Sequence, residues 1–388
     1  MPAAVSGTAA HLAEEWRTRA RAFVEREIVP LAEAMDQTDR LPDSIRPALA
    51  REGYLGFSTP KEWGGLGGDT RSTAAVLEEL SSGSAAVATM VAVQLSVVEG
   101  PLVRWGTDEQ KEHYLRPLAS GTALGAFALT EPGAGSDAAS LQCRYSRAGD
   151  HFLLNGTKTF ITNAASADTV LVFATRDPTR GAHGTSAFLL ARGEEGFDAR
   201  TTFDKLGIRG SDTAEIHLKD VRVPLRDLLG EEGSGLRIAL EALTNGRVGI
   251  AACALGVARA AYDELLTHTR SSPDDGNRTR VARSYVELQA ARALIEQAAA
   301  ARDAGAPFVE QASAAKLLAS RVASEVTTRA LEAAGRAGVA ASSRANRLWR
   351  DARVFPIVEG TSEIQELILG RELLGPRPAS DSDAARND

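Results

Sequence analysis

The sequence predicts an α+β protein that is mainly α, with an N-terminal helical domain (1–120), a central antiparallel β-barrel domain (121–230) and a C-terminal four-helix bundle (231–375). Helical periodicity in the first part, short β-type runs between turns in the second and long alanine-rich helices in the third predict this order. The tail 376–388 is rich in Pro, Ser, Asp and Asn, which predicts disorder.

Apolar residues of the N-terminal part recur at helical spacing. Leu12, Trp16 and Ala20 begin the pattern, and the glycine-rich segment 63–68 interrupts it as a turn. Further helices are expected from about residue 72, over 85–98 and over 108–118.

The central part carries turn signals between short apolar runs. Asn155-Gly156 is the dipeptide of a hairpin turn and is expected to separate two strands. Four further strands are expected over 170–174, 186–190, 197–202 and 214–223. This spacing is typical of a small antiparallel barrel or sandwich.

The C-terminal part is helical and rich in alanine from Leu236. Alanines and a glycine between 251 and 261 make a helix with thin side chains, which can pack closely on neighbouring helices. Three more long helices are expected over 290–302, 310–336 and 363–374, which together predict a bundle. We expect these alanine-rich helices to form an oligomer interface.

Composition narrows the classes of function. The 388 residues carry a net charge of -7, which argues against nucleic acid as a partner. The two cysteines, Cys143 and Cys253, match no metal or disulfide spacing, and no HExxH-like pair occurs, so we expect reduced thiols in a cytoplasmic protein without a metal site. No signal peptide is apparent, and no apolar window is expected to be long enough to span a membrane.

One carboxylate stands in an unusual place near the C-terminus. Glu359 follows the apolar run 355–358 and precedes a helix that Thr361 or Ser362 can cap, while Glu363 can accept from first-turn amides. Apolar neighbours raise the pKa of a carboxylate, which suits it to take a proton from a weak carbon acid. The alternative is a solvated Glu before an ordinary helix.

Four motifs make the chain resemble the acyl-CoA dehydrogenase family of flavoenzymes over about residues 10–375. They are Ala-Leu-Thr-Glu-Pro-Gly-Ala-Gly-Ser-Asp at 128–137, Gly-Thr-Lys-Thr-Phe-Ile-Thr-Asn at 156–163, Lys-Leu-Gly-Ile-Arg-Gly-Ser-Asp-Thr at 205–213, and Arg247 with the small-residue helix behind it. Without the resemblance, these segments would be a tight turn, a strand, a basic loop and a helix.

The resemblance implies bound FAD and a set of site residues. Glu359 is the match to the catalytic base, because the position that carries the base in some members is Gly246 here. The aromatic residue beside the flavin, often Trp in the family, is Phe160. FAD contacts are implied for Phe127, Leu129, Thr130, Gly135, Ser136, Phe160, Ile161, Thr162, Arg270, Glu332, Arg336, Thr361 and Glu363. Substrate contacts are implied for Ser136, Thr244, Arg247 and Gly360.

The implied reaction is an α,β-dehydrogenation of an acyl thioester. Glu359 would remove the α-proton while a β-hydride passes to flavin N5, which gives a trans-2-enoyl thioester. The thioester carbonyl would accept from the amide of Glu359 and from a flavin ribityl hydroxyl. The family implies an electron-transfer flavoprotein as electron acceptor, and a homotetramer or homodimer.

Three segments depart from the family pattern. Residues 270–276 replace an Arg-x-x-Phe-Gly stretch, Glu332 stands where a Gln is usual, and Val358 replaces a Tyr. A Glu near the FAD pyrophosphate would repel it, although Arg336 and Arg280 could offset that charge.

These departures keep three alternatives open. One is a dehydrogenase of an acyl thioester on a carrier protein in secondary metabolism, and another is a related flavin monooxygenase. The third is a non-catalytic paralogue that serves as an assembly partner.

Overall fold

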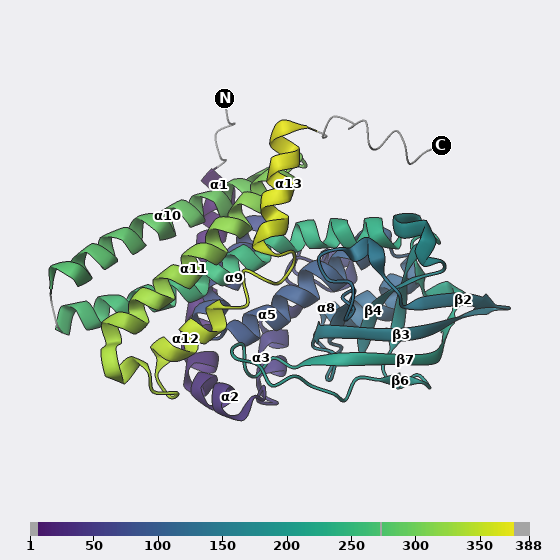
Figure 1. The fold of residues 1–388 in the computed structure, drawn as a ribbon, viewed down its shortest axis with the longest axis horizontal. Helices are drawn as coiled ribbons and strands as arrows, with labels where there is room; N and C mark the ends of the chain where they lie inside the picture. Colours follow the sequence, from purple (N-terminus) through teal and green to yellow (C-terminus); the bar gives the residue numbers. More distant parts are fainter. Residues whose placement is uncertain (1–6, 272–273, 376–388) are drawn as a thin grey trace.

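The computed structural model describes residues 7–271 and 274–375, so the predicted disordered tail lies outside it. Figure 1 shows the long C-terminal helices side by side and the β-sheet beside them, at the other end of the molecule. The fold is mainly helical with one sheet, as the sequence predicts.

Eight α-helices form the N-terminal part over its described residues, 7–120. They are α1 (Gly7–Phe23), α2 (Ala32–Thr38), α3 (Ile45–Arg51), α4 (Thr70–Gly83), α5 (Ala85–Val93), α6 (Gly100–Trp105), α7 (Asp108–Gln110) and α8 (Arg116–Ala119). A π-helical segment (Gln94–Glu99) joins α5 to α6. Asp69 begins α4 by accepting from the amide of Ser72 at 2.7 Å, as expected of an N-cap. The glycine turn at 63–68 is confirmed.

Eight strands form one sheet. They are β1 (Gly125–Ala128), β2 (Arg144–Ala148), β3 (His151–Thr162), β4 (Thr169–Thr175), β5 (Thr185–Ala191), β6 (Phe197–Asp198), β7 (Thr213–Pro224) and β8 (Leu228–Leu229). The pairing order is β6-β7-β3-β2-β4-β5-β8, and β1 lies on β4. Most pairs are antiparallel as predicted, but β1 and β2 both run parallel to β4.

The predicted hairpin turn at Asn155-Gly156 is wrong. Both residues lie inside β3, and the turn between β2 and β3 is at Gly149 instead. The Asn155 side chain exchanges hydrogen bonds with Asp220 on β7, at 3.0 and 2.9 Å. Gly156 lies at a register shift, where an added Cβ would be 2.7 Å from the Cα of Cys143. The dipeptide therefore lies at a β-bulge in β3, where the glycine lets the backbone of β3 approach that of Cys143 closely.

The other β predictions hold with one exception. The runs at 170–174, 186–190 and 214–223 are β4, β5 and β7, whereas only the first two residues of 197–202 form a strand. There, the side chain of Asp198 accepts from the amide of Arg200 at 3.0 Å, and this local turn ends β6.

Five helices form the C-terminal part, counted over the described residues 231–271 and 274–375. They are α9 (Gly235–Ser271), α10 (Asp275–Asp303), α11 (Val309–Gly338), α12 (Arg344–Ala352) and α13 (Ser362–Leu374). The helix predicted from 290 begins earlier, because Asp274 caps α10 through the amide of Asn277 at 2.8 Å. Three of these helices are long; α12 and α13 are short.

The alanine-rich helix α9 runs through the core of the helical part. Ala251, Ala254 and Ala258 are fully buried, and α9 packs on α4 and α11 of the same chain. The chain's own helices therefore cover the thin face of α9, and an oligomer interface formed by the alanine-rich bundle helices stays a prediction.

Two helical segments are long and apolar enough to cross a membrane, contrary to the prediction. They are Ala85–Trp105 and Gly235–Ser271, and 83% and 67% of their most apolar windows are buried inside the protein. Both are core helices, so their apolar length reflects internal packing.

Candidate active site

A strained turn between α12 and α13 carries Glu359. Glu359 and Gly360 both have left-handed backbone, with φ of +52° and +94°. This conformation costs a non-glycine residue about 1–2 kcal/mol, so the surrounding contacts must hold it. Thr361 then caps α13 by accepting from the amide of Ile364, as the sequence predicts.

The Glu359 carboxylate lies against Gly246, in the first third of α9. A Cβ added to Gly246 would be 2.0 Å from Oε2 of Glu359, so the absence of a side chain makes room for the carboxylate. Both carboxylate oxygens are buried, and among the described residues neither has a hydrogen-bond partner. Burial raises the pKa of Glu359 to about 8, although Lys316 and Arg247 act to lower it.

The contact between Gly246 and Glu359 explains how a carboxylate at either position, 246 or 359, could serve as the base. A carboxylate projecting from position 246 would occupy the region that the Glu359 carboxylate fills from the opposite side. In this chain the first position is glycine, which fits the assignment of Glu359 as the base.

Two cations flank the carboxylate. Arg247 on α9 is buried, and its Nη1 donates to Oγ of Ser313 on α11 at 3.4 Å. Burial lowers the pKa of Arg247, and Glu359 opposes this. Lys316 on α11 is fully buried and donates from Nζ to the carbonyl of Gly360 at 2.6 Å. Thr244, one turn before Arg247 on α9, donates to the carbonyl of Leu240 at 2.9 Å.

The sheet presents an aromatic ring at its surface. Phe160 on β3 is 64% exposed, and its φ is +57° at a register shift between Lys158 and Ile161. Its ring stacks on Phe203, with centroids 4.7 Å apart. Ile161 is buried and Thr162 half-buried. A strained backbone that turns an aromatic ring outward fits a platform for a flat ring such as flavin.

The loop after β1 is held by a buried ion pair. Phe127 and Leu129 belong to β1 and its end, and Leu129 offers its carbonyl to Lys158 Nζ at 3.0 Å. Lys158 Nζ also pairs with Glu131 at 2.7 Å. Thr130 accepts from the amide of Thr159 through its carbonyl, at 2.9 Å.

Two glycines in this loop have no packing reason of their own. A Cβ added to Gly133 or Gly135 would meet no atom within 4 Å, and Ser136 is exposed. A ligand that approaches the backbone closely would explain glycine here. The loop therefore fits the FAD and substrate contacts that the resemblance implies for Gly135 and Ser136.

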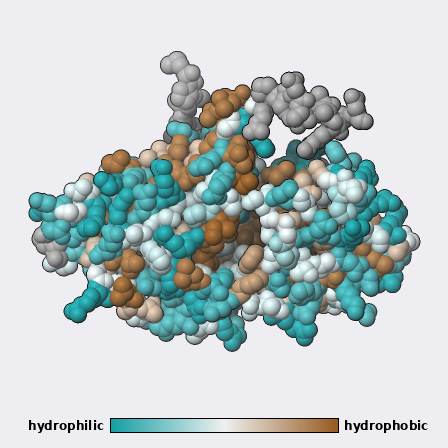
Figure 2. Space-filling model, in the orientation of Figure 1, coloured by the Kyte–Doolittle hydropathy of each residue, from teal (hydrophilic) through white to brown (hydrophobic). Residues whose placement is uncertain are grey.

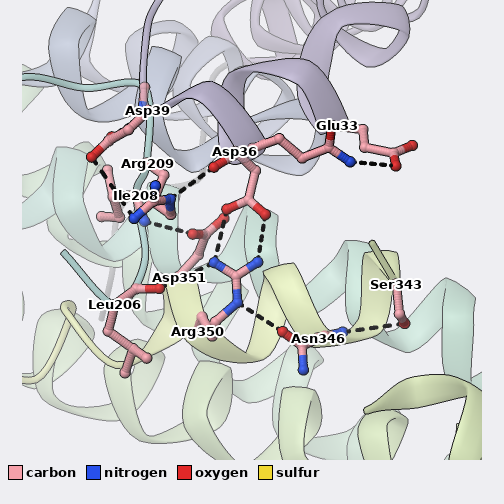
Figure 3. Close-up of polar contacts among 12 residues, drawn as sticks. Glu33, Asp36, Asp39, Leu206, Ile208, Arg209, Ser343, Asn346, Arg350 and Asp351 are labelled. Carbon is pink, nitrogen blue, oxygen red and sulfur yellow. Dashed lines mark hydrogen bonds and ion pairs between the residues drawn. The ribbon is translucent and has the colours of Figure 1, made fainter. Parts of the chain in front are cut away.

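The segment 205–213 fixes the helix that precedes the turn carrying Glu359. Figure 3 shows Arg350 of α12 in a bidentate pair with Asp36 of α2, at 2.8 and 2.5 Å. The neighbouring Asp351 accepts from the amide of Ile208 at 2.6 Å, and burial raises the pKa of Asp351 to about 6. A Cβ on Gly207 would meet the Arg350 backbone at 2.4 Å. The motif thus joins the β domain and α2 to α12.

The residues implied for the ADP half of FAD lie apart from Glu359 in this chain. Glu332 lies 16 positions beyond Lys316 on α11, roughly 24 Å at 1.5 Å per residue. Glu332 pairs with Arg280 at 3.5 Å, as the charge argument predicts. Arg270 and Arg336 are exposed near the ends of α9 and α11, and Figure 1 shows those ends on the side of the bundle away from the sheet.

Each of the three parts of the chain matches a model of one family. The N-terminal domain of acyl-CoA dehydrogenase matches residues 12–122, the middle domain 126–221 and the C-terminal domain 233–374. The short-chain specific acyl-CoA dehydrogenase of Clostridium acetobutylicum is 38% identical over 365 residues, which covers 92% of this chain and 96% of that protein.

The chain belongs to the acyl-CoA dehydrogenase family.

Solved acyl-CoA dehydrogenases share its fold. Butyryl-CoA dehydrogenase from Megasphaera elsdenii is 36% identical with a TM-score of 0.91, over 96% of this chain and 100% of that one. A glutaryl-CoA dehydrogenase from Mycobacterium smegmatis in complex with FADH2 is 30% identical with a TM-score of 0.89, over 97% of both chains.

Three further residues contribute to the site of this acyl-CoA dehydrogenase. Glu131 and Lys158 lie within the motifs at 128–137 and 156–163, but only the structure shows that they form a buried pair. Lys316 did leave a signal: it stands among alanines at 312, 315 and 319, on the face of α11 that the helical period assigns to the core.

Proposed function

We propose that the chain catalyses FAD-dependent α,β-dehydrogenation of an acyl-CoA thioester to the trans-2-enoyl thioester, with Glu359 as the base that removes the α-proton. The observation that carries this proposal is the state of the Glu359 carboxylate. Its oxygens are buried and, among the described residues, have no hydrogen-bond partner, so they are free to accept a proton from a substrate.

The raised pKa supports the same role. An α-proton beside a thioester is weakly acidic, so its pKa lies far above that of an ordinary carboxylate. A base whose pKa is about 8 lies closer to the pKa of the α-proton and accepts it at a smaller cost. As the proton moves to Glu359, negative charge develops on the thioester carbonyl oxygen, where the backbone amide of Glu359 is the proposed donor. When FAD is bound, it supplies an acceptor for the β-hydride at N5.

The residues around the sheet surface fit the isoalloxazine ring. We assign Phe160, Ile161 and Thr162 to one edge of that ring, and the segment from Phe127 to Ser136 to its polar atoms. Thr361 and Glu363, at the start of α13, would complete this half of the site. Ser136, Thr244, Arg247 and Gly360 are the proposed substrate contacts.

The ADP half of FAD is assigned to Arg270, Glu332 and Arg336 of a second copy of the chain. Within one chain these residues are too far from Glu359 to share a cofactor with it directly, which supports a site shared between subunits. We therefore propose a homotetramer or at least a homodimer.

The surface of α13 supports an oligomer. Figure 2 shows hydrophobic residues at the surface where α13 lies, and Leu367, Leu373 and Leu374 of that helix are exposed. Light scattering that showed a flavin-loaded monomer would contradict this assignment.

The electron acceptor and location follow from the family. We propose an electron-transfer flavoprotein as the partner that reoxidises the flavin, and a cytoplasmic location.

Replacement of the base tests the function. Glu359→Gln is expected to leave FAD bound but to slow anaerobic flavin bleaching by substrate about a hundredfold to ten-thousandfold, because the amide cannot take the proton. Glu366→Gln, which changes an exposed carboxylate on the same helix α13, is the matched control. Near-normal bleaching by the Glu359 variant would show that another group is the base.

The substrate panel also separates the alternatives. Acyl-CoA and acyl-carrier-protein thioesters of several chain lengths are compared by flavin bleaching under anaerobic conditions. Bleaching by carrier-bound substrates alone would indicate the carrier-protein enzyme, and rapid oxygen consumption with supplied reduced flavin would indicate a monooxygenase. A colourless protein that does not take up FAD would indicate a non-catalytic paralogue.

A further inference from the structure

A fully buried lysine reaches the catalytic turn from the neighbouring helix. Lys316 lies about two turns after the start of α11, with alanines at 312, 315 and 319 on the same buried face. Its Nζ donates to the carbonyl of Gly360 at 2.6 Å. A buried ammonium is costly, so a well-packed apolar side chain would serve stability better at this position. The cost points to a role at the turn.

The turn that Lys316 contacts is one that needs to be held. Glu359 and Gly360 adopt consecutive left-handed conformations, which are uncommon for glutamate. Nε2 of Gln365 also donates to the Gly360 carbonyl, at 3.0 Å. One turn along α11, Oγ of Ser320 donates to the carbonyl of Phe355 at 3.1 Å. Two residues of α11 thus fix the two ends of the segment that carries Glu359.

We propose that Lys316 is a positioning residue for the base: its ammonium holds the Glu359–Gly360 turn through the Gly360 carbonyl and places a positive charge beside the Glu359 carboxylate. This inference rests on the proposed function of Glu359. Ser320 and Gln365 share the mechanical part of this role, but neither carries a charge.

The charges around the carboxylate give the proposal a measurable consequence. Lys316 from α11 and Arg247 from α9 both favour the ionised form of Glu359. Cys253 of α9 also lies near this carboxylate. Burial lowers the pKa of Lys316 to about 8, although Glu359 and Glu363 of α13 act to raise it, so Lys316 carries its charge at pH 7. If the Lys316 charge is removed, Arg247 is the flanking cation that remains near Glu359 among the described residues. The pKa of Glu359 is therefore expected to rise further.

Three variants at this position separate charge from hydrogen bonding. Lys316→Met removes both, Lys316→Gln keeps a donor without the charge, and Lys316→Arg keeps both. With a rise of about one unit in the pKa of Glu359, Lys316→Met would slow flavin bleaching about tenfold at pH 7, with the deficit shrinking above pH 9. Lys316→Gln is expected to show the same shift, and Lys316→Arg a profile close to wild type.

Ser320→Ala is the matched control. It removes a hydrogen bond from the same helix to the same segment, but no charge, so it is expected to lower the rate without moving the pH profile. If Lys316→Met and Ser320→Ala both leave the profile unmoved, Lys316 is structural only and the proposal is overturned.

A second readout is independent of catalysis. The stability difference that Glu359→Gln produces depends on pH, and the pH at which it stops changing reports the pKa of Glu359 in the folded protein. That pH is expected to lie about one unit higher in the Lys316→Met background. An unchanged value there overturns the inference about Lys316 alone, whereas wild-type bleaching that does not depend on Glu359 would overturn the proposed function.

Discussion

Glu131 in the β domain and Glu359 between α12 and α13 both bury their carboxylates and have a buried lysine nearby, yet their surroundings differ. Glu131 accepts from Lys158 Nζ at 2.7 Å and from the amides of residues 142 and 143 at 2.7 and 3.0 Å. Glu359 has no donor on either oxygen among the described residues, and its nearby lysine binds the adjacent carbonyl.

The difference separates a carboxylate that is held by hydrogen bonds from the carboxylate that is proposed as the base. Full hydrogen bonding stabilises the charge of Glu131 and fixes the loop that follows β1. The oxygens of Glu359 accept no hydrogen bond from the described residues. Burial therefore disfavours the ionised form of this carboxylate. Positive charge beside the carboxylate, without a direct hydrogen bond, limits that cost while leaving the oxygens available.

The largest effect on stability is expected for the structural carboxylate. Glu131→Gln leaves the Lys158 ammonium uncompensated in the interior, a change that typically costs about 3–5 kcal/mol. Because the amides of Gln142 and Cys143 donate to Glu131, hydrogen exchange in this loop should become at least about a hundredfold faster. The double variant Glu131→Gln/Lys158→Met, which also removes the buried charge, should recover part of the protection. Unchanged exchange would mean that the pair does not hold the loop.

The Glu359 carboxylate, unlike that of Glu131, should destabilise the folded protein when it is ionised, so its effect on stability should depend on pH. In the unfolded chain a glutamate ionises near pH 4.5, but folded Glu359 does so near pH 8. Between these values the unfolded chain has released the proton that the folded chain still holds. The stability that Glu359 contributes is therefore present below about pH 4.5 and lost as the pH rises to about 8.

Urea unfolding measures this loss. The free energy of unfolding of wild type relative to Glu359→Gln is expected to fall by up to about 4 kcal/mol from pH 5 to pH 9. Glu366→Gln should show no such trend. A flat difference for Glu359→Gln would mean that the carboxylate is solvated in the folded protein.

The contrast between the two glutamates also shows what the sequence could reveal. The apolar run before Glu359 and the cap at Thr361 are local signals of its setting, whereas the resemblance to the family, with glycine at 246, implied its role as the base. The Glu131–Lys158 pair joins residues 27 positions apart in the chain, and nothing in either segment alone indicates that they meet.

Errors in the fold prediction had the same origin. Asn155-Gly156 has the local chemistry of a turn, but pairing with β2 and β7 on both sides keeps it in a strand. The apolar segments 85–105 and 235–271 are long because neighbouring helices surround them, which an isolated window does not show. The helical bundle itself was predictable from its three long helices, whereas the first half of α10 and the short helix α12 were missed.

A smaller change, one methyl group, should disturb the reactive glutamate without harming the fold. Gly246→Ala would place Cβ 2.0 Å from Oε2 of Glu359, so the carboxylate must move. Alanine is the better helix former by about 1 kcal/mol, so the stability of α9 should not suffer. A displaced base is expected to slow flavin bleaching at least about tenfold, since small shifts of reacting groups are costly.

Gly249→Ala is the control for that substitution. It lies one turn further along α9, and its Cβ would meet only the flexible end of Leu77, at 3.1 Å. Wild-type bleaching by Gly246→Ala would mean that the Glu359 carboxylate does not depend on the space above this glycine.

The smallest effect is expected for a third glutamate, which is neither buried nor catalytic. Glu332 is exposed and pairs with Arg280 at 3.5 Å. If a second copy of the chain brings FAD pyrophosphate here, the Glu332 charge opposes binding, while Arg280 already offsets part of it. Exposed charges contribute about 0.2–1 kcal/mol, so Glu332→Gln should tighten FAD binding by no more than about fivefold, most clearly at low salt.

Two further variants complete the test of this site. Arg336→Ala should loosen FAD binding by a similar factor, and Glu310→Gln, at the other end of α11, should leave it unchanged. Fluorescence titration of the apoprotein gives the three dissociation constants. Equal values for the Glu332 and Arg336 variants and wild type would place the ADP half of FAD elsewhere, and leave Thr130, Ser136, Phe160 and Thr162 as the part of the flavin site to pursue.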